Sequence, residues 1–443
     1  MTSDQDHDYG PEQAAFDGGL MDLFPVNVGT PGSPPSAPPA TVLTTGLNLG
    51  YFDGNTVTAM WNYAQYYSLN DNFYGTTFGP STPGALNLIS GQTNGVTNNN
   101  GLNSTGSTVD GGNGSPTVIG DPDPLGDVCA NPKRYQVQMG GTNIGDLLNA
   151  AGVTWGSFMG GFNPATVNPN GTQGCNRSST GLAGTTNDYI PHHAWFQYYA
   201  STANPVHARP SSIANIGKSG DAANHQYDLA DFYAAVSAGN FPAVNFIKAR
   251  AYQDGHAGYS DPLDEQKFVV HLINFLEGQP EWSNTAVVIM YDDSDGWYDH
   301  QPGQIVNQSQ TAADALNGRG FCGKALPILE GVTGPHAQGR CGYGPRQPFL
   351  IVGPYAKHNS VDHTMADQSS VLRFIEDNWL AGKRIGQGSF DAIAGSINAM
   401  FDFRQSMQND LVILSEETGE VIFASSPAMA AAKAYAATLK TQQ

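Results

Sequence analysis

The second half of the chain shows two different periods of apolar and polar positions. Residues 261–278 (DPLDEQKFVVHLINFLEG) place apolar side chains three and four positions apart, which predicts an amphipathic helix. Residues 285–293 (TAVVIMYDD) form a nearly continuous apolar run, which is typical of a parallel strand buried on both faces. The segments FLIVGP and QSSVLRFIEDNW add a strand of the same kind and another helix.

The first half repeats this alternation. TNIGDLLNAAG predicts a helix ending at Gly152 and VTWGSFMGGF a strand, and residues 228–249 repeat the helix-glycine-strand order. Further helices are predicted over 10–24 and 56–69, and one begins near Ser81. Alternating strands and helices predict an α/β fold with a mostly parallel central sheet between helical layers.

Composition adds long loops to this picture. Charged residues make up 13% of the chain, about half the usual ~25%, while Gly (53) and Pro (28) are abundant. Residues 89–127 are poor in apolar side chains and are predicted to form a loop insertion on the surface. The net charge of -20 argues against a nucleic-acid partner, because a polyanion would be repelled. The sequence contains no run of 18 apolar residues, so no membrane span is predicted.

The four cysteines all lie in loop-like sequence without a C-x-x-C pair, which disfavours a zinc ribbon or a thioredoxin-type site. We expect them to pair in chain order, Cys129 with Cys175 and Cys322 with Cys341, in an oxidising compartment. Four free thiols in a cytosolic protein are the alternative. The first residues, MTSDQDHDYGPEQ, do not have the basic and apolar regions of a secretion signal.

The clearest candidate chemistry follows the apolar run at 285–291. Asp292 and Asp293 come at the predicted carboxyl end of a strand, where functional groups gather in parallel sheets, and Asp295, Asp299 and His300 follow closely. Paired carboxylates on a rigid element suit a divalent cation. The alternative is a solvated acidic turn.

Ser81 is a second candidate. It follows a strand and a Gly-Pro turn and precedes a helix, so its hydroxyl is expected beside unpaired backbone N–H groups that favour a bound phosphate. A serine activated by a cation can attack phosphorus. The simpler alternative is that Ser81 only caps the helix.

Several basic side chains could act on a phosphoryl group. His192 and His193 are adjacent in DYIPHHAWF, and His256 lies in the glycine-rich loop QDGHAGYSDP. Each could bind phosphoryl oxygens or protonate a leaving alcohol. His271 is interpreted as a packed helix residue, and Arg346 either as an anion clamp or as a structural residue.

Together these motifs resemble one family, the bacterial phosphoesterases that include acid phosphatases and non-haemolytic type phospholipases C. TAVVIMYDDSDGWYDH resembles the family's Asp-acid-x-x-Gly-aromatic-x-Asp-His motif. Further matches are FGPSTPGALNLISG, DYIPHHAWFQYY, HAGYSDP, GPRQPFLIVGPYAK with VDHT, SSVLRFIEDNW and NAMFDF. The resemblance spans residues 5–403 and implies a three-layer α/β/α core like that of alkaline phosphatases.

The resemblance also implies roles for the acidic pair and the serine. Ser81 falls at the family's nucleophile, and Asp292 and Asp293 fall at the acidic pair that binds one divalent metal ion together with Ser81. The second acidic position is often Glu in relatives, so Asp293 is expected to hold the cation slightly differently.

The histidines match the family as well. His256 matches a histidine near the transferred phosphoryl group, and His192 and His193 match the His-His pair on its other side. His7, in DHDYGPEQ, matches a further pocket histidine through a short motif.

The family's pattern departs from this chain at the amino end. Relatives carry an export signal and a first strand that ends in a Glu-Asn pair of metal ligands, both before the position of His7. The chain is therefore expected to be an N-terminally truncated phosphoesterase domain over 1–405, with a C-terminal extension over 406–443.

The predicted function is metal-dependent hydrolysis of small phosphoric esters, most simply phosphomonoesters, in the periplasm or outside the cell. Phospholipase C action on phosphodiester head groups is the alternative within the class. Outside it, the chain could be an inactive remnant or a secreted protein that binds carbohydrate.

Overall fold

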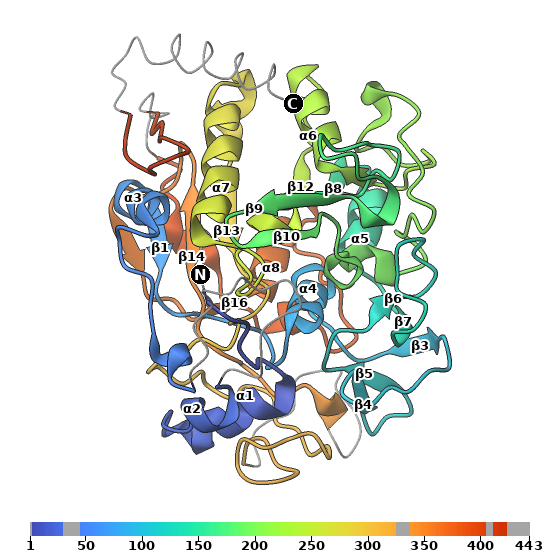
Figure 1. Ribbon diagram of the computed structural model, residues 1–443, viewed down its shortest axis with the longest axis vertical. Helices are drawn as coiled ribbons and strands as arrows, with labels where there is room; N and C mark the ends of the chain where they lie inside the picture. Colours follow the sequence, from blue (N-terminus) through green and yellow to red (C-terminus); the bar gives the residue numbers. More distant parts are fainter. Residues whose placement is uncertain (1, 30–44, 325–336, 405–410, 423–443) are drawn as a thin grey trace.

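Two separate sheets carry most of the core. The computed structural model describes residues 2–29, 45–324, 337–404 and 411–422 (Figure 1). One sheet has the order β11 (Gln226–Asp228), β8 (Trp155–Met159), β12 (Val244–Lys248), and all its strands are parallel. The other has the order β13 (Val287–Met290), β14 (Phe349–Val352), β1 (Ser68–Asn70), β15 (Ser360–Asp362). The protein is therefore mixed α/β, as expected, but its sheets are small.

The direction of two strands differs from the prediction. β13 and β14 pair with each other in antiparallel fashion, and β14 is also antiparallel to β1. The prediction that both are parallel strands is wrong, because strand direction depends on which distant segments pair and not on an apolar run. β14 is fully buried, whereas the side chains of β13 are only half-buried.

Short local signals explain where the helices begin and end. Asn143 caps α5 (Ile144–Ala151) in a capping box with Asp146, and Gly152 ends it in the left-handed conformation. A second capping box, from Asp228, starts α6 (Leu229–Ser237). Asp261 accepts a hydrogen bond from the Leu263 N–H at the start of α7 (Pro262–Glu277). These helices and α8 (Ser369–Trp379) confirm the predicted ones.

The amino-terminal third is more broken than its pattern suggests. The predicted helix over 10–24 divides into α1 (Tyr9–Phe16) and α2 (Phe24–Asn27), because the chain turns at Asp17 and Gly18 with positive φ. The helix predicted over 56–69 is α3 (Thr58–Tyr66), and its last residues belong to β1. The helix at Ser81 is α4 (Ser81–Ser90).

The insertion at 89–127 contains secondary structure of its own. It holds four short strands, and together with β7 (Gln136–Met139) they make two small sheets: β3 (Val96–Asn99), β4 (Thr108–Asp110), β5 (Pro116–Val118) and β6 (Asp123–Pro124). Two further pairs complete the strands: β2 (Phe73–Tyr74) with β16 (Ala366–Asp367), and β9 (Ser178–Gly181) with β10 (Gly184–Asn187).

Figure 1 shows how the parts are arranged. The parallel sheet with α5 and α6 lies on one side, the mixed sheet with α3 on the other, and α7 lies between them. A groove of about 740 Å³ lies between β12 and β13, with mostly apolar walls that include Leu272 and Leu276 of α7. At one end of this groove Lys248, Asp254 and Asp292 make it polar.

The cysteines pair as predicted, Cys129 with Cys175 and Cys322 with Cys341. Disulfides are typical of proteins from oxidising compartments.

Within the expected C-terminal extension, residues 411–414 are buried, and the Val412 N–H donates to Glu277 of α7 at 3.1 Å. The rest of this extension, 406–410 and 423–443, lies outside the described residues. No described helix has the length and apolarity to cross a membrane.

Candidate active site

Ser81 is held at the first position of α4 by a tight approach turn. Gly79, in the preceding turn, has a φ of 113°, a conformation that residues with a side chain rarely adopt. Pro80 takes the cap position, so the interpretation of Ser81 as the helix cap is wrong. The Ser81 hydroxyl instead donates a hydrogen bond to Asp293 Oδ2 at 2.8 Å. The predicted nucleophile and one predicted metal ligand are thus in direct contact.

The two predicted metal-binding aspartates turn in different directions. Asp293 faces Ser81, and its Oδ1 accepts from the Asp295 backbone N–H at 2.6 Å. Asp292 Oδ2 instead accepts from Lys248 Nζ at 3.0 Å. The Asp292 backbone lies against α4, where a Cβ on Gly84 would come within 1.7 Å of the Asp292 carbonyl oxygen. This contact allows only glycine at position 84.

Asp299 and His300 do not belong to the site. Asp299 forms an ion pair with Arg346 at 3.0 Å, and Arg346 also donates to the Asp71 carbonyl. The His300 side chain is 75% exposed. Arg346 therefore has the structural role that was one of its two interpretations. His271 lies on α7 beside Glu416, at 3.1 Å.

Lys248 connects the acidic pair to the histidine pair. Its side chain, at the end of β12, is 16% exposed. Asp254, in the following loop, lies 3.6 Å from His193 Nδ1 through its Oδ2. Burial raises the pKa of Asp254 to about 6, although the Lys248 ammonium opposes this rise. We call Lys248, Asp292, Asp254 and His193 the lysine side of the site.

The histidine pair presents two different rings. His193 is buried, and burial together with the Lys248 charge holds its pKa well below the usual value, so the ring is neutral. Its Nε2 is buried without a hydrogen-bond partner in the described residues. His192 Nδ1 accepts from Arg134 Nη1 at 3.2 Å, and its carbonyl oxygen accepts from the Thr82 hydroxyl. The pair therefore adjoins the start of α4.

The amino end of α4 already has an anionic neighbour. The Thr82 N–H donates to Asp121 Oδ1 at 2.8 Å, and Asp121 comes from the end of the 89–127 insertion. Burial alone would raise the pKa of Asp121, but His192 and the Thr82 N–H lower it, so the group is a carboxylate. One of the backbone donors that we expected for a phosphate is thus occupied.

His7 and His256 lie in a second group of ligating side chains, which adjoins the lysine side where the His256 backbone N–H donates to Asp254 Oδ1 at 3.2 Å. Their ligand atoms and those of two carboxylates all lie within 4.8 Å of one another, and we call this set the His–Asp cluster: Asp4, His7, His256 and Asp295. Burial would lower the pKa of both histidines, but the surrounding aspartates, with Asp295 prominent for each, raise it above its usual value. Asp295 joins the cluster to Asp293 through its backbone N–H.

Glu12 of α1 holds this assembly from behind. It is buried, its Oε2 accepts from the Gly79 N–H at 3.0 Å, and its Oε1 accepts from the Ser294 hydroxyl. Burial raises the pKa of Glu12 to about 8. One side chain therefore ties the turn before Ser81 to the loop after β13.

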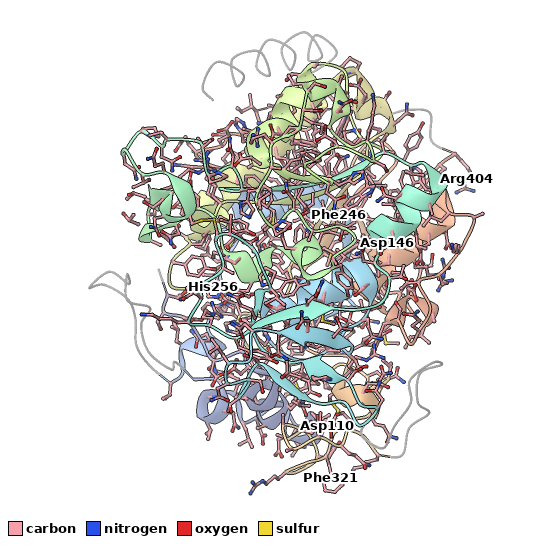
Figure 2. All side chains as sticks on the ribbon, turned by 90° about the vertical axis from the view of Figure 1, so that its right-hand side faces the viewer. Asp110, Asp146, Phe246, His256, Phe321 and Arg404 are labelled. Carbon is pink, nitrogen blue, oxygen red and sulfur yellow. A yellow bond between two sulfur atoms is a disulfide. The ribbon has the colours of Figure 1, made fainter. Side chains whose placement is uncertain are left out.

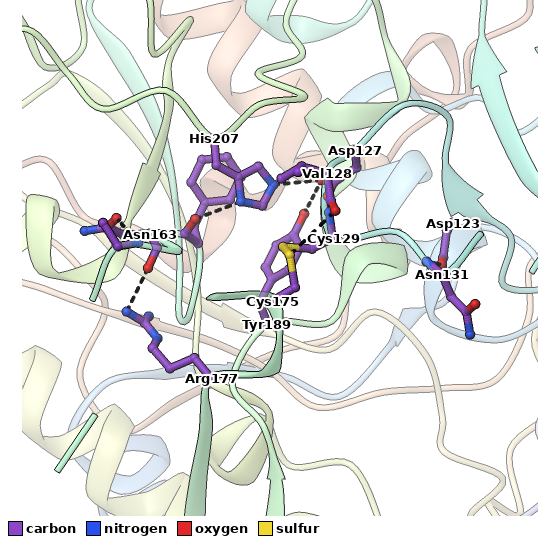
Figure 3. The surroundings of a disulfide bond; sticks show 12 residues. Asp123, Asp127, Val128, Cys129, Asn131, Asn163, Cys175, Arg177, Tyr189 and His207 are labelled. Carbon is purple, nitrogen blue, oxygen red and sulfur yellow. Dashed lines mark hydrogen bonds and ion pairs between the residues drawn. A yellow bond between two sulfur atoms is a disulfide. The ribbon is translucent and has the colours of Figure 1, made fainter. Parts of the chain in front are cut away.

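A third group of metal-ligand types is structural. Asp127, Cys129 and His207 lie close together, but Cys129 is bonded to Cys175 (Figure 3). The His207 ring spans the Phe162 carbonyl at 2.8 Å and Asp127 Oδ2 at 3.0 Å. Tyr189 and Gln197 also donate to Asp127. All of these groups are satisfied by one another.

The fit of the predicted cation site is partial. Ser81 and Asp293 offer a hydroxyl and a carboxylate on one side, as expected for a hard cation. Asp292 is already neutralised by Lys248. The structure thus brings Ser81, Asp293 and all four predicted histidines into one region. It adds residues to which the sequence analysis assigned no role: Lys248, Asp254, Asp121, Glu12, Asp4 and Arg134.

Comparison with known proteins identifies the family. A model of the phosphoesterase family matches residues 1–381, and the chain belongs to that family. A non-hemolytic phospholipase C of Pseudomonas aeruginosa is 28% identical over 176 residues, which cover 38% of this chain and 24% of that protein. Another, of Burkholderia pseudomallei, is 28% identical over 264 residues, covering 56% of this chain and 36% of that protein.

One further relative and one solved structure complete the comparison. Phospholipase C A of Mycobacterium tuberculosis is 25% identical over 39% of this chain and 32% of its own length. The matched segments thus cover only a quarter to a third or so of the curated relatives. The solved structure of murine ectonucleotide pyrophosphatase/phosphodiesterase 5 aligns with 78% of this chain and 95% of its own, with a TM-score of 0.35 and 12% identity.

Proposed function

We propose that this protein hydrolyses phosphoric esters, most simply phosphomonoesters, with Ser81 as the nucleophile. The observation that carries the proposal is the 2.8 Å hydrogen bond from the Ser81 hydroxyl to Asp293. It orients the oxygen and gives its proton an acceptor, which an attacking serine requires. Phosphoesterase family membership supports the same reaction class.

The other residues divide the remaining work. Ser81 attacks phosphorus while the leaving alcohol departs on the opposite side, and water then cleaves the phosphoserine. His193 Nε2 and the adjacent His192 are placed to bind phosphoryl oxygens or pass a proton to the leaving oxygen. A divalent cation beside Ser81, Asp292 and Asp293 would lower the serine pKa and neutralise phosphoryl charge. To bind it, Asp292 would have to leave Lys248.

Mutation of the serine tests the reaction. With p-nitrophenyl phosphate as substrate, we expect Ser81→Ala to lower kcat by about a thousandfold or more, because the hydroxyl that attacks phosphorus is removed. Ser219→Ala, at an exposed serine, is the matched control and should keep the parent rate. Equal rates for Ser81→Ala and the parent would exclude Ser81 as nucleophile.

Phospholipase C action is the second candidate, and the groove between β12 and β13 favours it. Its volume of about 740 Å³ has mostly apolar walls, and Lys248 and Asp292 also line it, so a lipid chain could lie there while the phosphate reaches the site. Filling the groove by Leu272→Trp should then slow hydrolysis of a long-chain phosphatidylcholine but not of p-nitrophenyl phosphorylcholine. Loss of both rates together would argue against the groove as a lipid site.

We also propose a periplasmic or extracellular location, on the evidence of the two disulfides.

A further inference from the structure

The His–Asp cluster combines four side chains from three distant segments of the chain. Asp4 and His7 precede α1, His256 lies in the loop after β12 (Figure 2), and Asp295 follows β13. Each offers an atom to a space in which all four atoms lie within 4.8 Å of one another. Such convergence of two imidazoles and two carboxylates requires a physical reason.

Hydrogen bonds to the backbone set the tautomers of both rings. His7 Nδ1 lies 2.8 Å from the Gln5 carbonyl oxygen, and His256 Nδ1 lies 2.6 Å from the Ala257 carbonyl oxygen. A carbonyl can only accept, so each Nδ1 carries a hydrogen, and each neutral ring keeps its lone pair on Nε2. Histidines that ligate a metal are held in this way, with the second ring nitrogen donating to a carbonyl or carboxylate.

The carboxylates of the cluster are incompletely satisfied. Asp4 Oδ1 and Asp295 Oδ1 are shut off from solvent and make no hydrogen bond within the described residues. Asp295 Oδ2, by contrast, accepts from the Ala257 N–H at 2.6 Å. The nearest basic atoms are His7 Nδ1, 3.7 Å from Asp4 Oδ1, and His256 Nε2, 3.6 Å from Asp295 Oδ1. Neither is close enough for a hydrogen bond, and a buried anionic oxygen without one is costly.

The spacing fits a cation better than direct pairing. His256 Nε2 and Asp295 Oδ1 are 3.6 Å apart, too far for a hydrogen bond. Two ligands at about 2.0–2.2 Å from a tetrahedral zinc ion are separated by about 3.4 Å. A small closure of the cluster would therefore give metal-ligand distances.

We propose that the His–Asp cluster is a site for a second divalent cation of the zinc class. The mixed nitrogen and oxygen ligands favour zinc over magnesium or calcium, which prefer oxygen alone. The 2+ charge would balance the two carboxylates. The site differs from the one expected at Asp292 and Asp293, but Asp295 and Asp293 place the two side by side.

A cation here would deepen the proposed function, on which this step rests. It would face the same phosphoryl group as Ser81, and two neighbouring cations can stabilise the attacking and leaving oxygens of one displacement. His256 would then act as a ligand, and the leaving-group proton would fall to His192 or His193.

Zinc titration of the metal-free protein tests the site without any substrate. The full chain is stripped with a chelator and titrated with Zn²⁺ by calorimetry, and with Co²⁺ by visible absorption, which reports tetrahedral coordination. We expect His7→Gln and His256→Gln each to weaken the binding of one equivalent by on the order of 100-fold, at least as much as loss of a supporting partner costs. His300→Gln, at an exposed histidine, is the matched control and should bind like the parent.

The same experiment can overturn the proposal. Equal zinc binding by the parent and the cluster variants would contradict it. Zinc binding that is lost in Asp292→Asn but kept in His7→Gln would contradict it as well. Phosphate that binds the metal-free protein and requires His7 would make the cluster an anion site instead. Asp4→Asn, which preserves shape, replaces any histidine variant that does not fold by circular dichroism. The titration measures binding and not turnover, so its result does not depend on the proposed function. If the protein binds zinc at the cluster but hydrolyses no phosphoric ester, the proposed function fails and the cation site stands.

Discussion

The lysine side of the site and the His–Asp cluster deal with buried carboxylates in opposite ways. On the lysine side, the Lys248 ammonium lies 3.0 Å from Asp292, so the negative charge has an internal partner. In the His–Asp cluster, Asp4 and Asp295 each keep a buried oxygen without a hydrogen bond. On the first side the protein neutralises the carboxylate by itself, whereas the second has the composition of a site that an ion completes. Aspartates that follow the same strand can therefore have different roles, depending on which side chains of the neighbouring segment lie beside them.

Removal of the internal partner should have the largest effect on stability. Lys248→Met leaves Asp292 without its ammonium, and we expect the free energy of unfolding to fall by about 3 kcal/mol, since breaking a buried pair strands the other charge. Addition of Asp292→Asn should restore much of the loss. Urea denaturation measures both variants, with Lys218→Met at an exposed position as control. If Lys248→Met were as stable as the parent, Lys248 would not stabilise Asp292, and the lysine side would not differ from the His–Asp cluster in how its carboxylate is neutralised.

The buried carboxyl of Glu277 sharpens the comparison, because it belongs neither to the lysine side nor to the His–Asp cluster. Glu277 accepts from the Val412 N–H at 3.1 Å, and burial raises its pKa to about 8. A pKa raised on folding stabilises the protein below the unfolded value of about 4.5, and this contribution is lost as the pH rises through 8.

We therefore expect the stability of the parent to fall relative to Glu277→Gln between pH 5 and 7, by about 2.5 kcal/mol. Thermal unfolding at several pH values measures the difference, and Glu420→Gln, at an exposed carboxylate, should show none. A constant difference across this range would show that folding does not raise the pKa of Glu277.

The smallest effect is expected in the cluster, and with the opposite sign. In metal-free protein, burial raises the pKa of Asp4 although His256 and His7 oppose the rise, so the charge is unfavourable there. Asp4→Asn removes it, and stability should rise by about 1 kcal/mol or less, since the side chain is 33% exposed. Added zinc should raise the melting temperature of the parent, because a ligand of the folded state stabilises it, but not that of the variant. Asp22→Asn, at an exposed position, should follow the parent. Metal-free Asp4→Asn that is less stable than the parent would place Asp4 among the structural carboxylates.

Much of the site could be predicted because its parts are local. Ser81 follows a Gly-Pro turn and opens a helix, and Asp293 follows an apolar run, so each has a signal within ten residues. The contact between them was expected only through resemblance to a family. The 3.6 Å approach of Asp254 to His193 had no such signal, because it joins two loops about 60 positions apart.

The sequence by itself determined the helices, their caps, the loop-rich composition and the residue types available for chemistry. These depend on side chains three or four positions apart and on hydrogen bonds within one turn. The tertiary structure decided the direction of β13 and β14, the pairing of Lys248 with Asp292 and the gathering of His7 with His256 and Asp295. These outcomes depend on which distant segments pack together. A burial pattern records that a residue is enclosed, and it does not record by what.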